Sequence, residues 1–185
     1  MTERETNRVK IKVWDPLVRI GHWTLVVGIV AAWLTRHGAG TWHEWLGYIV
    51  LAMVILRVAW GFIGSHYARF AQFVHSPSDT LNYGKQILDG HEPRHVGHNP
   101  LGGWMIVALL FATAAVCASG WIYTTDQYWG VKWVEELHEG LTNVLFTLVA
   151  LHIGGVIFSS LRHRENLLAS MFHGRKRVPM DNDVT

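Results

Sequence analysis

The sequence predicts an all-α protein, a four-helix bundle that spans a membrane, and both composition and segment length support this. Of the 185 residues, 50% are hydrophobic and 16% are charged, whereas an average soluble domain has about 25% charged residues. Four apolar segments reach the length of about 20 residues that a helix needs to cross a bilayer. We expect residues 1–185 to form a single integral membrane domain, because this length suits one compact domain.

The four apolar segments are separated by connections of different character. A short connection joins the first two spans, and an aromatic connection of intermediate length joins the last two. A long polar connection, rich in histidine, separates the second span from the third. Apolar and polar residues mix over about 66–90, which predicts amphipathic stretches on the inner membrane surface; a plain solvated loop is the alternative. The predicted spans are about 17–35, 43–63, 101–123 and 138–160.

Basic residues predict the orientation of these spans. They gather in the N-terminal stretch, the long connection and the C-terminal tail, whereas the other two connections carry only Arg36 and Lys132. Lys and Arg concentrate on the cytoplasmic side of membrane proteins. Both termini are therefore predicted to be cytoplasmic, so the first span runs outward and the second and fourth run inward.

Four intramembrane histidines then form two pairs of matching depth. His138 and His152 lie 14 residues apart on the fourth span, which corresponds to about 21 Å of helix axis and nearly the same helix face. His22 lies near the inner end of the first span, and His43 lies near the outer end of the second. The predicted pairs are His22 with His152 near the inner face, and His43 with His138 near the outer face.

Two facing imidazoles inside a bilayer suit the axial positions of a haem iron, because haem is flat and apolar and accepts two axial ligands. Zinc or copper fits less well, since zinc normally needs three or four protein ligands that converge on one ion. A histidine proton relay and a haem-free transporter are further alternatives, and His98 is the rival ligand at the inner face. The chain has one cysteine, Cys117, so haem cannot be attached through a Cys-x-x-Cys-His motif. Small residues that would let the rings approach the backbone are Gly21, Gly47, Gly140, Gly154 and Gly155.

Several short motifs occur in a fixed order along the chain. On these motifs the sequence resembles the bacterial cytochrome b561 family, which includes the b-type cytochrome subunits of nickel–iron hydrogenases. The resemblance extends from about residue 13 to residue 177. The matching segments are 13–16 (VWDP), 19–23 (RIGHW), 42–48 (WHEWLGY), 57–62 (RVAWGF), 97–103 (GHNPLGG), 136–139 (ELHE) and 151–153 (LHI).

The resemblance implies a four-helix cytochrome of the bacterial inner membrane with two non-covalent b haems. It implies axial ligands from the first, second and fourth spans, which are His22, His43, His138 and His152. It also implies electron transfer between a periplasmic redox partner, such as a soluble cytochrome, and the quinone pool. An electron carrier is favoured over a stand-alone enzyme. The alternatives are a superoxide-to-quinone oxidoreductase that acts without a protein partner, and a haem-binding sensor. We expect contacts with membrane lipid and none with nucleic acid.

Overall fold

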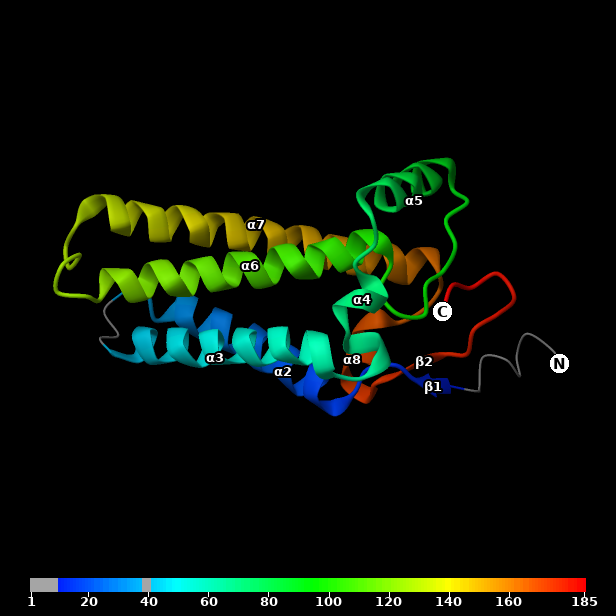
Figure 1. Cartoon of the computed structure of the whole chain (residues 1–185), viewed down its shortest axis with the longest axis horizontal. Helices are drawn as coiled ribbons and strands as arrows, with labels where there is room; N and C mark the ends of the chain where they lie inside the picture. Colours follow the sequence, from blue (N-terminus) through cyan, green and yellow to red (C-terminus); the bar gives the residue numbers. More distant parts are fainter. Residues whose placement is uncertain (1–9, 38–40) are drawn as a thin grey trace. The chain divides into compact units, whose positions relative to one another are not determined.

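The computed structural model describes residues 10–37 and 41–185, and Figure 1 shows that they are mostly helical. Four helices are long and apolar enough to cross a membrane. The all-α transmembrane prediction is therefore confirmed. The last of these helices begins six residues before the predicted span, because the mixed polar and apolar residues 132–137 extend it at its N-terminal end. These helices are α2 (Pro16–Leu34), α3 (Thr41–Ile63), α6 (Pro100–Tyr123) and α7 (Lys132–Arg162).

Contacts between residues divide the chain into two compact units, and all four long helices continue from one unit into the other. Of the described residues, the helical unit comprises 20–37, 41–59 and 107–151, and the terminal unit comprises 10–19, 60–106 and 152–185. The prediction of one membrane domain over the whole chain stays a prediction.

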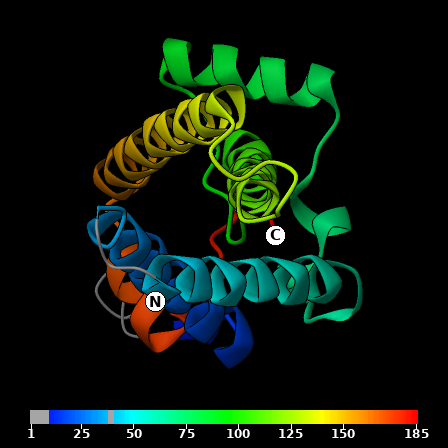
Figure 2. The ribbon, with the colours of Figure 1, turned by 90° about the vertical axis from the view of Figure 1, so that its left-hand side faces the viewer.

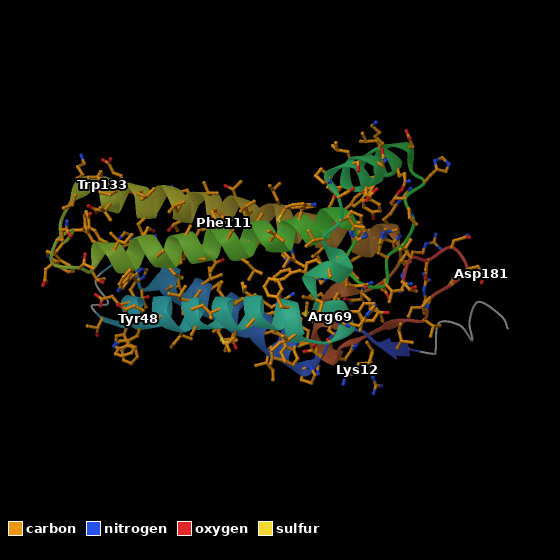
Figure 3. All side chains as sticks on the ribbon, viewed as in Figure 1. Lys12, Tyr48, Arg69, Phe111, Trp133 and Asp181 are labelled. Carbon is orange, nitrogen blue, oxygen red and sulfur yellow. The ribbon has the colours of Figure 1, made fainter. Side chains whose placement is uncertain are left out.

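Apolar side chains cover the outside of the helical unit, as expected for helices in lipid. Phe111 on α6 is 76% exposed, and Figure 3 shows it and Tyr48 on the outer sides of their helices. A soluble protein rarely exposes so many large apolar side chains together. The inside of this unit is packed by small and branched residues, among them Val50, Val54 and Leu145.

The terminal unit contains a short two-stranded ribbon that the sequence did not predict. Strand β1 (Lys10–Lys12) pairs antiparallel with β2 (Arg175–Arg177). Beside the ribbon, Val13, Trp14 and Val96 form a small buried cluster. The ribbon and this cluster hold the N-terminal stretch, the long connection and the C-terminal tail together.

The long connection is helical over much of its length. It contains a 3-10 turn η1 (His66–Ala68), α4 (Phe70–Phe73) and α5 (Pro77–Asp89). Helix α5 begins after Ser76, because the Ser76 hydroxyl accepts a hydrogen bond from the backbone N–H of Asp79 at 3.1 Å. Figure 2 shows α5 as a short helix of the long connection. The position of α5 on a membrane surface stays a prediction.

Asp15 explains the VWDP motif at the start of α2. Its Oδ1 atom accepts a hydrogen bond from the backbone N–H of Val18 at 2.9 Å, which caps the helix. Its Oδ2 atom accepts hydrogen bonds from the Trp60 indole at 3.1 Å and from the Ser65 hydroxyl. Burial alone would raise the pKa of Asp15, but these hydrogen bonds outweigh it and lower the pKa. One carboxylate therefore joins the start of α2 to the end of α3.

A buried group of charges fixes the C-terminal tail after α8 (Leu167–His173). Arg94 is 6% exposed, binds Glu165 at 2.8 Å and also pairs with Asp183. Lys176 is 5% exposed and donates to the Val96 carbonyl at 3.0 Å. Burial lowers the pKa of Lys176 to about 8, although nearby Glu165 opposes the shift.

Candidate functional site

Helices α3 and α7 bring His43 and His138 together inside the helical unit. Their ring centroids lie 6.1 Å apart and their planes are nearly perpendicular, at 86°. The depth argument from the sequence paired the same two residues. Of the two predicted histidine pairs, this one lies within a single unit of the structure.

The separation of the two rings can be compared with the size of a metal–imidazole bond. A ring nitrogen lies about 1.1 Å from its centroid and about 2 Å from a metal ion it binds, so two opposite imidazoles have centroids about 6 Å apart. The observed 6.1 Å agrees with one ion held between the rings. The residues present therefore fit the axial positions of a haem iron.

The hydrogen bonds of both rings select the nitrogen that can bind a metal. His43 Nδ1 lies 2.9 Å from the carbonyl oxygen of Ala32 on α2, and His138 Nδ1 lies 3.1 Å from that of Val116 on α6. A carbonyl only accepts hydrogen bonds, so each Nδ1 carries the proton. The coordinating lone pair is then on Nε2, and the bond at Nδ1 fixes the orientation of the ring, as is common for histidine ligands of metals.

Two residues of α6 support His138, and the sequence analysis missed both. The Ser119 side chain is 3% exposed, and its Oγ atom lies 3.0 Å from His138 Nδ1. A methyl group at Gly120 would lie 3.0 Å from Cε1 of the same ring, so glycine gives the imidazole its room. The third span contains no histidine, so the sequence did not indicate that this span contributes to the site. The run of small residues at 118–120 is the signal that could have indicated a helix surface against which a ring packs.

The glycines expected near the ligands leave space beside the helices. A methyl group added at Gly47 or Gly140 would meet no described atom within 4 Å, and the same holds for Gly154 and Gly155. At Gly21 it would lie 3.5 Å from Met53. The helix surfaces next to the histidines thus carry no bulk that would exclude a large flat group.

His22 and His152 belong to different units. His22 lies on α2 in the helical unit, with its ring 5.2 Å from that of Trp23. His152 lies on α7, at the position where the chain enters the terminal unit, whose last segment is residues 152–185. Their pairing stays a prediction.

The rival ligand His98 lies in an aromatic setting within the terminal unit. Its ring centroid lies 4.5 Å from that of Trp14 and 4.9 Å from that of Phe73. His98 therefore packs beside the buried cluster of Val13, Trp14 and Val96 in the terminal unit.

Two further histidines meet in the long connection. The ring centroids of His75 and His95 lie 6.2 Å apart, and the Tyr83 ring lies 5.1 Å from that of His95. Burial lowers the pKa of His95, so its ring is neutral at pH 7. Over residues 10–37 and 41–185, no group of three or more His, Cys, Asp or Glu side chains could hold a metal ion. The converging set that a structural zinc site requires is not found in this part of the chain.

Comparisons with known proteins show the family to which this chain belongs. The profile of the family described as prokaryotic cytochrome b561 matches residues 13–174. A probable Ni/Fe-hydrogenase B-type cytochrome subunit of Bradyrhizobium diazoefficiens is 23% identical, over 95% of this chain and 89% of the relative. A protein of the same description from Rhizobium leguminosarum bv. viciae is 24% identical, over 94% of this chain and 92% of the relative. No solved structure matches. The chain belongs to the prokaryotic cytochrome b561 family and is a membrane protein that transfers electrons through b-type haem.

Proposed function

We propose that this chain binds two non-covalent b haems and transfers electrons across the bacterial inner membrane. In this proposal His43 and His138 are the axial ligands of the outer haem, and His22 and His152 are those of the inner haem. The observation that carries the proposal is the His43–His138 pair, with ring centroids 6.1 Å apart and both Nδ1 atoms bound to carbonyls. The inner pair rests on the spacing along α7, which puts His152 about 21 Å from His138 along the helix axis.

The chain's own residues would hold and tune the haems. When bound, haem iron supplies a centre that gains and loses one electron. His43 and His138 would hold it through Nε2, and the carbonyls of Ala32 and Val116 would keep the rings oriented. Because each Nδ1–H is bound to an oxygen, the ligands become more basic, which favours the oxidised iron. Apolar side chains around the site lower the dielectric and exclude water.

We also propose that both termini face the cytoplasm. The antiparallel pairing of β1 with β2 supports this, because it requires both ends of the chain to lie on one side of the membrane. Four spans, an even number, satisfy the same requirement. The basic residues of the terminal segments then select the cytoplasmic side. In this orientation α5, with Leu81 69% exposed and Leu88 87% exposed, lies on the inner membrane surface, and the chain forms one membrane domain.

The proposed partners are a periplasmic redox protein and the quinone pool. Similarity to relatives described as hydrogenase cytochrome subunits supports a protein partner. The alternative, direct reaction with superoxide, would need positive charge near the outer haem. At the outer face Lys132 lies 3.6 Å from Glu136, so its charge is partly balanced. We therefore favour an electron carrier with a protein partner over a stand-alone enzyme.

The haem content of purified protein tests the proposal. A pyridine haemochrome assay on detergent-solubilised protein should give two b haems per chain. His43→Ala and His138→Ala should each retain one haem and lose the same one, whereas His22→Ala and His152→Ala should each lose the other. His91→Ala is the matched control, because His91 is exposed in the long connection. Two intact haems in His43→Ala would refute the outer pair, and loss of the inner haem in His98→Ala but not in His22→Ala would refute the inner pair.

A further inference from the structure

The ribbon gathers four cations on one face. In the register of β1 and β2, Lys10 lies opposite Arg177 and Lys12 lies opposite Arg175. Side chains of a strand alternate between its two faces, so these four point to the same side. Ile11 and Lys176 point to the other side, where Ile11 packs on the buried cluster and Lys176 is 5% exposed. We call the four-residue face the cationic ribbon.

The arrangement of charges on the cationic ribbon opposes folding. Like charges directly opposite each other on paired strands repel and destabilise the pairing. Among residues 10–37 and 41–185, the cations that form ion pairs in the terminal unit are Arg94, Arg162 and Lys176. No residue of the cationic ribbon forms an ion pair within these residues. Both Lys10 and Lys12 are exposed, and Figure 3 shows Lys12 at the outer edge of the terminal unit. A concentrated positive charge of this kind is suited to an anionic ligand.

The position of the cationic ribbon in the chain indicates which anion it meets. Lys12 lies four residues before Pro16, where the candidate span α2 begins, so it lies no more than about 14 Å from the end of the span. On the other strand, one residue, Gly174, separates Arg175 from α8, and α8 exposes Leu168 (58%) and Phe172 (60%) one turn apart. Exposed apolar residues beside basic ones are typical of a segment that lies at a membrane interface.

We propose that the cationic ribbon binds the phosphate groups of anionic phospholipids in the membrane that the four helices span. The cations contact the headgroups, and Leu168 and Phe172 contact the start of the acyl chains. Lipid is favoured over an acidic protein because the ribbon is tied to the end of a membrane span at headgroup depth. The proposal does not depend on haem ligation, so either can fail while the other stands.

Binding of defined lipids to the purified, haem-containing chain tests the proposal. Native mass spectrometry in a neutral detergent compares phosphatidylglycerol with phosphatidylcholine of the same acyl chains. Wild type should prefer phosphatidylglycerol. Removal of one cation near a membrane surface weakens the attraction about fivefold, so K10Q/K12Q should bind phosphatidylglycerol about 25-fold more weakly at low salt. The matched control R36Q/K132Q removes two exposed cations of the outer connections and should bind like wild type.

Each other outcome overturns the proposal. Equal binding of the two lipids by wild type shows that headgroup charge is not recognised. Equal loss in K10Q/K12Q and R36Q/K132Q shows a response to net charge alone. Displacement of phosphatidylglycerol by equimolar glycerol 3-phosphate assigns the surface to a free phosphate. Unchanged lipid binding in K10Q/K12Q, together with lost binding of an acidic soluble cytochrome, assigns it to a protein partner. Haem spectra should be the same in all variants.

Discussion

Replacement of Gly120 by alanine tests whether α6 positions the His138 ring. The added methyl group would lie 3.0 Å from Cε1 and 3.3 Å from Nδ1 of the ring, whereas carbon atoms in good contact are about 3.5–4.0 Å apart. The ring must therefore shift by about half an ångström. The 3.1 Å hydrogen bond from His138 Nδ1 to the Val116 carbonyl would then reach about 3.6 Å, which is too long for a hydrogen bond.

The expected effect on the outer haem follows from this lost bond. A hydrogen bond of this kind contributes about 1 kcal/mol, and 59 mV corresponds to about 1.4 kcal/mol for a one-electron couple. Loss of the bond makes the ligand less basic and destabilises the oxidised iron. In Gly120→Ala we expect the midpoint potential of one haem to rise by up to about 40 mV, while the potential of the other haem is unchanged.

Redox titration followed at the reduced b-haem absorption band measures both potentials in one sample. Gly84→Ala is the control, because a methyl group there meets no described atom within 4 Å, yet the change gives a helix the same gain in propensity, about 0.5–1 kcal/mol. If both potentials are unchanged in Gly120→Ala, or if both shift equally, then Gly120 does not position an axial ligand.

Three further predictions concern the terminal unit and are checked by thermal unfolding in detergent. Asp15→Asn should lower stability by about 1 kcal/mol at pH 7; because the folded pKa of Asp15 is lowered from 3.8, this difference should shrink as the pH falls from 3.8 through the folded pKa, and a difference that stays constant over acid pH would contradict it. Arg94→Met should cost about 3–5 kcal/mol, because it leaves the Glu165 and Asp183 carboxylates buried without their cation; the exposed Arg69→Met should cost nothing measurable. Wild-type stability should rise between about pH 8 and pH 10.5, by up to about 3 kcal/mol, since the lowered pKa of Lys176 leaves the unfolded state binding more protons there; Lys176→Met should remove this rise, and a rise of the same size in that variant would refute the assignment.

The spans could be predicted because they depend on local properties, whereas the outer histidine pair stays a prediction. Hydrophobic length fixes a membrane helix in any context. His43 and His138 were paired from their depths alone, and depth follows from the direction of each span and the rise per residue. The structure brings these two rings together at 6.1 Å.

The features that sequence reasoning missed depend on contacts between distant segments. Ser119 and Gly120 are small residues with no distinctive pattern in the sequence. Their role depends on His138 of α7, whose ring lies against them in the folded chain. Strands β1 and β2 have three residues each, too few for an alternating pattern to be recognised. The packing of His98 on Trp14 and Phe73 likewise follows from three segments that meet in the terminal unit.

The hydrogen bond from Trp14 to Ser170 joins residues that are 156 positions apart. During synthesis, Trp14 leaves the ribosome long before its partner exists, so the contact cannot form until all four spans have been translated. Contacts between such distant residues also form slowly. Assembly around Trp14 therefore follows the synthesis of all four spans. A chain that stops before the C-terminal tail can insert its helices in the membrane, yet it leaves this tryptophan uncovered and open to quality-control proteases.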